Sequence, residues 1–416
     1  MEKEKFRLKH PEIMIVIFLV LVAIASASFA YACQASGKQD PGFYEIIAEN
    51  KQEVKYYGTD FSFYYYFDGE KSITAERSEI KNYYSDELSS LYAITDEDNT
   101  YASYVSIGKI NEHPNEEVVV SSTLYNILYD AYSKTKESDN YSIFATPLYA
   151  FWYQQFGYEH AYRVKNDPLN SETSRTYLQE TADYINSRDN IDLLFIGDGK
   201  VKLTVSEAYL NYRQEKGITT PYMSLNVLRN AYILSNLKTS LLIKNYDKGF
   251  IVSNDGNVLQ FNHCPSQSYS YYSVDNLLLY RAADIKFETL PSSCSNFRRF
   301  NLNDVEIPNY YYFTQDGVTY FRSLYLNISN GLENNLLLSS GIYNTDLEIL
   351  DKAYLNNELI TCDSLEEIQE YLSLHSLGGL KLALNLVNKP KIINITNSLK
   401  ENINLNSELD YNLNII

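Results

Sequence analysis

Cysteine and histidine are scarce in this chain, which has four cysteines and five histidines among its 416 residues. No two cysteines have the close spacing of a zinc site, and the histidines are scattered, with only His263 next to a cysteine. The sequence therefore gives no indication of a structural zinc site. In an oxidising compartment one disulfide can form among Cys264, Cys294 and Cys362, and Cys264–Cys294 is one of three pairings that stay open.

Several signature motifs are also missing. The chain has no glycine-rich dinucleotide fingerprint, no phosphate-binding P-loop, no His-Glu-x-x-His and no Gly-x-Ser-x-Gly. Ordinary nucleotide-binding, zinc-protease and serine-hydrolase functions therefore lose support. Basic residues are in deficit, with 35 Lys and Arg against 53 Asp and Glu, and the formal net charge is -18. Because nucleic-acid binding depends on Lys and Arg neutralising phosphates, we expect no nucleic-acid partner.

Long flexible linkers are absent from the middle of the chain. No stretch rich in Pro, Gly or Ser interrupts residues 53–389, and the hydrophobic content of 45% is enough for a large core. We therefore expect one compact domain over residues 53–389. Residues 33–52 are expected to be a linker. Residues 390–416, rich in Asn, Ile, Leu and Ser without a clear period, are expected to be a frayed low-complexity tail.

Secondary-structure signals indicate an α+β fold. Asp-Gly pairs beside β-like runs are typical of hairpin turns, because both turn residues must tolerate positive φ. Helices are indicated by an N-cap at Ser121, by a capping box that starts at Ser364, and by the apolar run from Val227 to Leu237. The predicted sheet is therefore mainly antiparallel, with hairpin turns at Asp68-Gly69, Asp198-Gly199, Asp255-Gly256 and Asp316-Gly317.

The N-terminus has the pattern of an export signal or a membrane anchor. A basic head, residues 1–10, precedes an apolar run without charge from Ile13 to about Ala32. A run of about 20 residues is long enough to span a bilayer, so length alone does not separate cleavage from retention. Ala30-Tyr31-Ala32 before Cys33 matches an Ala-x-Ala cleavage site and, loosely, a lipoprotein box. We predict that residues 1–32 are a signal peptide or anchor and that Cys33 is lipidated, the alternative being an uncleaved helix. The protein is then extracytoplasmic and membrane-anchored.

Further landmarks occur in a fixed order along residues 53–389. The helix predicted after Ser121 has apolar residues on one face and leads into a loop, then into Pro147-Leu148 and Trp152. This order resembles that of the FAD:protein FMN transferase family (ApbE-like), in which such a helix precedes a Gly-Ala-Phe-Asp loop. The segments that match family motifs are Tyr57-Gly58-Thr59, Ile110-Asn111, Asp139 to Ser142, Leu241 to Asn245, Ser293 to Phe300, and the segment that opens with Glu348 and Asp351.

The resemblance implies a fold, a cofactor and a reaction. The family fold is an antiparallel sheet with packed helices, related to the T-fold. Its members use Mg²⁺ to move FMN from FAD to a Thr or Ser of an exported flavoprotein, so such an acceptor is the implied partner. Carried onto this sequence, the family's FAD-binding positions are Tyr57, Asn140, Tyr141 and Ser142. The alternative for Asn140 to Ser142 is a plain surface turn.

The metal-binding positions implied by the resemblance are Glu348 and Asp351. Mg²⁺ takes hard oxygen ligands, typically one or two carboxylates together with phosphates and water. Residues three apart share a face if their segment is helical, so these two carboxylates could hold one ion. The alternative is a solvated acidic turn of a helix.

Several polar groups of the family are missing. Ser142 stands where the family's Gly-Ala-Phe-Asp loop has its carboxylate, no lysine lies near Tyr222-Met223-Ser224, and Leu355 stands where the family has a Thr. Residues 320–327, where the family's His-Ile-x-Asp-Pro loop is expected, contain neither the His nor the Asp-Pro. Missing electrostatic groups typically cost about a hundredfold to a thousandfold in rate each. We therefore assign no catalytic residue and favour a flavin- or partner-binding module.

Two alternatives stay open. The first is an active Mg²⁺-dependent transferase in which Arg299, Arg322 and Asn356 replace the missing groups, Arg322 meeting a phosphate directly. The second is a surface adhesin that uses tyrosine clusters as stacking platforms. Aromatic packing across strands explains the same clusters without any ligand, and we expect it for Tyr64 to Tyr66, Tyr271-Tyr272 and Tyr310 to Tyr312.

Overall fold

The computed structural model describes residues 40–50, 54, 60–70, 72–262, 268–275, 278–287, 292–298 and 311–416. The predicted anchor (residues 1–32), Cys33, Tyr57, Cys264 and Arg299 lie outside these residues. Cys294 and Cys362 are buried. Within the described residues, no helix is both long enough and apolar enough to cross a membrane.

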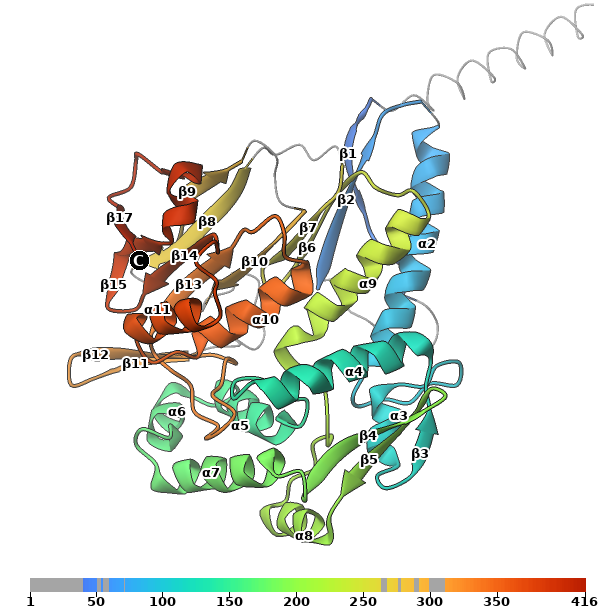
Figure 1. Ribbon diagram of the computed structural model, residues 1–416, viewed down its shortest axis with the longest axis vertical. Helices are drawn as coiled ribbons and strands as arrows, with labels where there is room; N and C mark the ends of the chain where they lie inside the picture. Colours follow the sequence, from blue (N-terminus) through green and yellow to red (C-terminus); the bar gives the residue numbers. More distant parts are fainter. Residues whose placement is uncertain are drawn as a thin grey trace, which may run out of the picture.

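The largest sheet of the described residues has nine strands (Figure 1). All its neighbouring strands pair antiparallel except the last two, which are parallel. The prediction of an α+β fold with a mainly antiparallel sheet is confirmed. In spatial order the strands are β1 (Gly42–Ile46), β2 (Phe61–Phe67), β6 (Gly249–Ser253), β7 (Asn257–Gln260), β10 (Ser293–Arg298), β13 (Leu337–Ile342), β14 (Leu382–Leu386), β15 (Lys389–Ile395) and β17 (Asn412–Ile415).

In the part of the chain that the structure describes, three smaller sheets accompany the large one. One packs on β13 and β15 and joins strands that are distant in sequence, in the order β16 (Ile403–Leu405), β9 (Leu278–Lys286) and β8 (Ser268–Asp275). The second has the order β3 (Glu117–Val119), β5 (Lys200–Val205) and β4 (Ile191–Gly197). The third is the hairpin of β11 (Tyr311–Gln315) and β12 (Val318–Arg322).

Helices cover one face of the large sheet, and further helices together with the small sheet of β3, β5 and β4 form the lower part of the molecule in Figure 1. On the sheet, α9 (Arg229–Ile243) packs between α2 (Ile73–Thr95) and α10 (Ile349–Ile360), and α10 lies on β10 and β13. The remaining helices are α3 (Ile107–Glu112), α4 (Ser122–Glu137), α5 (Thr146–Phe156), α6 (His160–Asn166), α7 (Glu172–Asn186), α8 (Glu207–Lys216), η1 (Asn226–Leu228), α11 (Leu365–Leu374) and η2 (Asn397–Asn402).

Local signals place the helices well. Ser121 caps α4, because its Oγ accepts a hydrogen bond from the Leu124 N–H at 3.2 Å. The predicted apolar face of α4 is buried. At α11 the Ser364 Oγ accepts from the Glu367 N–H at 3.1 Å, and the Glu367 carboxylate accepts from the N–H of Asp363 rather than from that of Ser364. The capping box is therefore present, but the Glu367 side chain accepts from the residue before the N-cap rather than from the N-cap itself.

The Asp-Gly pairs form hairpins at three of the four predicted places. Asp198-Gly199 joins β4 to β5 with φ of 50° and 72°, and Asp316-Gly317 joins β11 to β12 with φ of 52° and 78°. Asp255-Gly256 joins β6 to β7, with φ of 98° at the glycine. The hairpin predicted at Asp68-Gly69 is wrong, because this pair follows β2 and leads into α2.

Two further conformations predicted from the sequence are wrong. Leu241 to Asn245, matched to a family strand, is the end of α9, because Leu234, Leu237 and Leu241 recur at helical spacing and are all fully buried. A strand that ends directly before an Asn, as predicted for Leu241 to Asn245, is instead formed by β6, which Asn254 follows. Residues 42–46 of the expected linker form β1, which pairs with β2.

The expected frayed tail is ordered. Its Ile393 and Ile395 side chains, on β15 of the large sheet, are fully buried. β15 pairs with β14 on one side and with β17 on the other. The intervening segment returns to the neighbouring small sheet as β16. Polar Asn residues between the isoleucines also bond to one another, since Asn414 Nδ2 donates to Asn394 Oδ1 at 2.8 Å. Because polar Asn residues lie between the isoleucines of these strands, the sequence of the tail shows no apolar period.

The tyrosine clusters serve packing across strands, as expected. Tyr64 lies opposite Phe250 on β6 with ring centroids 5.0 Å apart, and Tyr66 lies opposite Phe43 on β1 at 5.0 Å. Tyr271 and Tyr311 are buried. Tyr64 and Tyr66 are half-buried, and Tyr312 is 38% exposed beside Phe321, so the clusters pack across strands without all entering the core.

Candidate functional site

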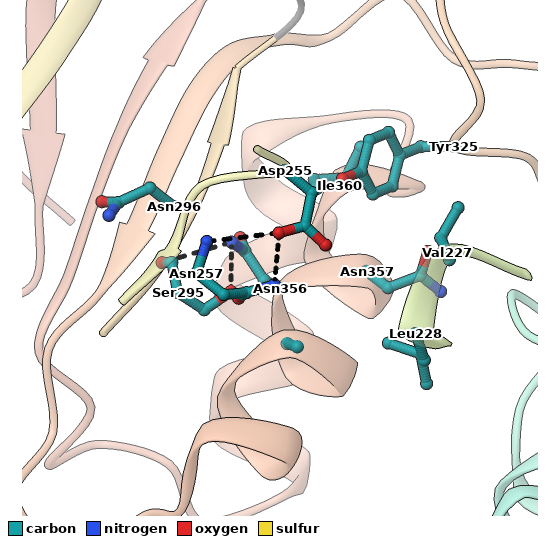
Figure 2. Close-up of a pocket in the computed structure, with 11 residues that line it drawn as sticks. Val227, Leu228, Asp255, Asn257, Ser295, Asn296, Tyr325, Asn356, Asn357 and Ile360 are labelled. Carbon is teal, nitrogen blue, oxygen red and sulfur yellow. Dashed lines mark hydrogen bonds between the residues drawn. The ribbon is translucent and has the colours of Figure 1, made fainter. Parts of the chain in front are cut away.

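A polar cavity lies where five parts of the chain meet beside the large sheet. Figure 2 shows its lining, which comes from the β6–β7 turn, β10, η1, α10 and the segment after β12 that carries Tyr325. Its empty volume is about 270 Å³, part of which is open to solvent. Two of these parts, β10 and α10, carry motifs matched to the family. The lining residues are Val227, Leu228, Asp255, Asn257, Ser295, Asn296, Tyr325, Ala353, Asn356, Asn357 and Ile360.

The β6–β7 turn supplies the only carboxylate of the lining. The Asp255 Oδ1 accepts hydrogen bonds from the Asn257 Nδ2 at 3.0 Å and from the Ser253 hydroxyl. Burial raises the pKa of the Asp255 carboxyl, and these donated hydrogen bonds partly oppose the rise. The turn thus holds a carboxylate and an amide side by side at the wall of the cavity.

The amide N–H groups of the lining are used to bind the framework. Asn356 Nδ2 donates to the Ser295 Oγ at 3.3 Å, and its Oδ1 accepts from the Ser340 hydroxyl. Asn296 Nδ2 donates to the Gly256 carbonyl at 3.2 Å, and Asn357 Nδ2 donates to the Asn140 carbonyl at 2.9 Å. These bonds hold α10, β10 and the β6–β7 turn together. They leave the cavity poor in donors.

Two acceptor oxygens in the lining have no hydrogen-bond partner among the described residues. They are the Oδ1 atoms of Asn257 and Asn357, whose residues are 4% and 1% exposed. No Lys, Arg or His belongs to the lining. The cavity therefore offers acceptors and one carboxylate, which suit a cationic or donor-rich ligand and not an anion.

The predicted FAD-binding loop lies against α10 but its groups are engaged. Asn140 Nδ2 donates to the Glu358 carboxylate at 3.3 Å. Tyr141 is fully buried with its hydroxyl donating to the Leu225 carbonyl at 3.2 Å, and burial raises its pKa far above the ordinary value. The Ser142 Oγ accepts from the Phe144 N–H at 3.1 Å. The segment is thus neither a plain surface turn nor a set of free ligand donors, so its residues do not fit FAD in this arrangement.

The predicted metal ligands lie at the other end of α10. Glu348 precedes the helix as its N-cap residue, and its carboxylate forms an ion pair with Lys238. Asp351 lies in the first helical turn and is exposed. Among the described residues, no group of three or more His, Cys, Asp and Glu side chains is arranged to hold a metal. The ion pair with Lys238 engages one of the two carboxylates, and Asp351 leaves one for an ion that takes one or two, so the metal site at these residues stays a prediction.

The positive groups near the cavity are turned away or neutralised. Lys352 on α10 is fully buried, and its Nζ donates to the carbonyl and the Oγ of Ser293 at 2.7 and 2.9 Å. Burial lowers its pKa to about 8. Arg322, expected to meet a phosphate in an active enzyme, instead forms a bidentate pair with Asp167 at 2.8 and 3.1 Å. Neither cation faces the cavity.

Structural comparison shows what this architecture resembles. No protein-family model matches the chain, and no curated protein matches its sequence. The ApbE protein of Thermotoga maritima is 16% identical, with 87% of this chain and 99% of that one aligned at a TM-score of 0.57. The flavin transferase ApbE of Vibrio cholerae is 12% identical, with 87% and 99% aligned at 0.51. The flavinyl transferase ApbE of Pseudomonas stutzeri, in its apo form, is 10% identical, with 88% and 99% aligned at 0.51.

The chain has the ApbE flavin transferase fold. The match runs over most of this chain and nearly all of each ApbE chain, so the fold is shared as a whole rather than over one motif. This confirms the architecture implied by the sequence resemblance.

Sequence reasoning missed the group that lines the cavity of this ApbE fold. The sequence marks Asp255 only as a turn residue, and nothing marks Asn257 or Asn357. One signal was available, because Asn254-Asp255-Gly256-Asn257 directly follows an alternating apolar strand and so places polar side chains at a strand end. Asn356 was a candidate for an active site, and the structure places it in the lining as a framework contact.

Proposed function

We propose that this protein is an exported, membrane-tethered member of the ApbE fold that has lost FMN transfer and works as a binding module. One observation carries the proposal. The cavity formed by α10, β10 and the β6–β7 turn contains a carboxylate and unpaired amide oxygens, and none of its lining residues is basic. A pyrophosphate would meet acceptors there instead of donors.

The chemistry of transfer explains why this matters. Moving FMN from FAD breaks a pyrophosphate, and the charge that builds on the phosphate oxygens must be neutralised by a metal and positioned donors. Two candidate cations, Lys352 and Arg322, bond instead to Ser293 and to Asp167. If each missing electrostatic group lowers the rate of transfer by about a hundredfold to a thousandfold, little turnover would remain.

The small size of the cavity favours a partner that binds the molecular surface over a ligand enclosed in the cavity. An empty volume of about 270 Å³, partly open to solvent, falls below the range of roughly 300–1,000 Å³ that is usual for small-molecule sites. We infer a protein partner, for which an exported flavoprotein is the class suggested by the fold. The buried tyrosines of the hairpins give no support to an adhesin.

A titration of the purified full-length chain with FAD, with and without Mg²⁺, tests the proposal. We expect no release of AMP from FAD under either condition, measured by chromatography of the nucleotides. The variant Asp351→Ala should give the same result as the unchanged chain. Release of AMP that depends on Mg²⁺ and is lost in Asp351→Ala would establish an active transferase and refute the proposal. Quenching of FAD fluorescence without cleavage would identify flavin itself as the bound partner.

Tethering is a separate part of the proposal and rests on the basic head and apolar run before Cys33. If Cys33 carries the lipid, Cys33→Ser should move the protein from the membrane fraction to the soluble fraction of its host. Retention of the Cys33→Ser variant in the membrane would instead favour an uncleaved helix.

A further inference from the structure

A buried carboxylate joins α10 to the loop that follows α4. Glu358 of α10 is 5% exposed, and both of its carboxylate oxygens accept hydrogen bonds from the loop of residues 138–142. We propose that Glu358 and Asn140 form a proton-linked latch, which holds this loop on α10 more tightly at acidic pH than at neutral pH. The latch does not depend on whether the protein binds flavin or a protein partner.

Two donors of the loop meet the two oxygens of the carboxylate. The Ser138 hydroxyl donates to Oε1 of Glu358 at 2.5 Å, and Asn140 Nδ2 donates to Oε2 at 3.3 Å. The Ser138 Oγ also accepts the N–H groups of Asn140 and Tyr141, at 2.8 and 2.9 Å. Because a hydroxyl has one proton and two lone pairs, these contacts leave the Ser138 proton directed at Oε1. The Oε1 side of Glu358 therefore meets a fixed donor.

An added proton is therefore carried on the Oε2 side, where the partner can change its role. The side-chain amide of Asn140 has no other hydrogen-bond partner among the described residues, so it can turn over and present its Oδ1. In the ionised state Asn140 donates an N–H to Oε2, and in the neutral state its Oδ1 accepts the carboxyl O–H. The loop thus keeps two hydrogen bonds to Glu358 in both states, and only the charge of the carboxyl group changes.

The charge of Glu358 is not balanced by a cation. No Lys, Arg or His nitrogen of the described residues lies within 4 Å of its oxygens. Lys134 of α4 lies over the Tyr354 ring, but it pairs with Asp130 at 3.2 Å. The other titratable groups that interact with Glu358 or with Tyr354 are acidic or neutral, namely Asp139 of the loop, Glu137 of α4, Tyr371 of α11 and Cys362 after α10. The ionised carboxylate thus depends on neutral donors for its stabilisation.

This environment sets the sign of the pH dependence. Burial raises the pKa of the Glu358 carboxyl above its ordinary value of 4.5, the hydrogen bonds from Ser138 and Asn140 partly oppose the rise, and the charge of Asp139 adds to it. The folded protein therefore binds this proton more tightly than the unfolded chain does. The resulting stabilisation is fully present below the pKa of the unfolded chain and is lost as the pH rises through the raised pKa of the folded state. The latch is thus stronger when Glu358 is neutral.

The latch lies at the edge of the polar cavity. Asn357, the residue before Glu358, belongs to the cavity lining, and its Nδ2 donates to the Asn140 carbonyl at 2.9 Å. A loop that loosens at neutral pH would therefore release the side chain of Asn357 as well. The protonation state of Glu358 thereby sets how firmly one wall of the cavity is held.

Thermal melting of the full-length chain and of Glu358→Gln, between pH 4.5 and pH 8, tests the proposal. A glutamine has nearly the shape of the neutral carboxyl group, with an oxygen for the Ser138 hydroxyl and an N–H for the Asn140 Oδ1. Glu358→Gln should melt about 2 °C or more above the unchanged chain at pH 8, and this difference should shrink towards pH 4.5. Glu370→Gln, which removes an exposed carboxylate from α11, should give no such pH-dependent difference. A difference that is the same at all pH values, or a lower melting temperature of Glu358→Gln at pH 8, would overturn the proposal.

Hydrogen exchange of the unchanged chain follows the loop itself and stays decisive if Glu358→Gln folds poorly. The N–H groups of Asn140 and Tyr141 are bonded to the Ser138 Oγ, so peptides that cover residues 138–142 report on loop closure. After correction for the intrinsic pH dependence of exchange, their protection should fall from pH 5 to pH 8. The protection of peptides from β13 and β14 should stay constant over the same range. Equal protection of the loop at the two pH values would contradict the proposal.

Discussion

Asp167→Asn is expected to lower the free energy of unfolding by about 3–5 kcal/mol, the cost of leaving a buried charge without its partner. Asp167 is fully buried and Arg322 is 6% exposed, and the two form a bidentate ion pair. The same carboxylate accepts a hydrogen bond from the Tyr311 hydroxyl at 2.5 Å. The variant would leave the buried guanidinium beside the stacked rings of Phe313 and Tyr320 without a counter-charge.

Urea denaturation of Asp167→Asn and of Glu117→Gln, each against the unchanged chain, measures this effect. Glu117 pairs with Lys200 at 3.1 Å, but the two side chains are 52% and 43% exposed. An exposed pair contributes about 0–1 kcal/mol, so Glu117→Gln should have little effect. Similar losses in the two variants would mean that the buried pair contributes nothing beyond a surface contact.

Gly256→Ala is expected to have the second large effect, a loss of about 2–5 kcal/mol. Gly256 has φ of 98°, and an added Cβ would lie 2.4 Å from the carbonyl oxygen of Asn296 on β10. Positive φ costs an L-residue about 1–2 kcal/mol. Overpacking against a backbone that cannot easily move adds about 1–3 kcal/mol. The β6–β7 turn would have to separate from β10, which would widen the cavity.

Gly317→Ala is the matched control for Gly256→Ala. Gly317 is also the glycine of an Asp-Gly hairpin, its φ is 78°, and an added Cβ would meet nothing within 4 Å. Its loss should be limited to the conformational term of about 1–2 kcal/mol. Equal losses at the two glycines, measured by urea denaturation, would contradict the close approach of the turn to β10.

Local features of the fold were predictable from the sequence. The Ser121 cap, the buried face of α4 and the hairpin at Asp198-Gly199 each depend on residues a few positions apart. Their signals, an N-cap side chain, helical spacing and positive φ, are therefore contained in a short window. The order of motifs also indicated the ApbE fold, which the structural comparison confirms.

Long-range pairing was not predictable in the same way. Arg322 looks available in the sequence because its partner Asp167 lies 155 residues away. Asn140 looks like a free loop residue, yet it bonds to Asn357 and Glu358 across 217 and 218 residues. The segment Leu241 to Asn245 failed for another reason, since a short apolar run fits a strand and a helix equally well until its partners are known.

The order of strands in the large sheet has a consequence for how the protein acquires its structure. β1 and β17, the first and the last strand of the described residues, form the two edges of the sheet, and β2 has β6 as its inner neighbour. During synthesis the aromatic strand Phe61–Phe67 therefore stays without this neighbour until Gly249–Ser253 has been made. Such distant contacts slow folding and leave nascent strands open to aggregation. The large sheet can therefore be completed only once Asn412–Ile415, its last strand, has been made.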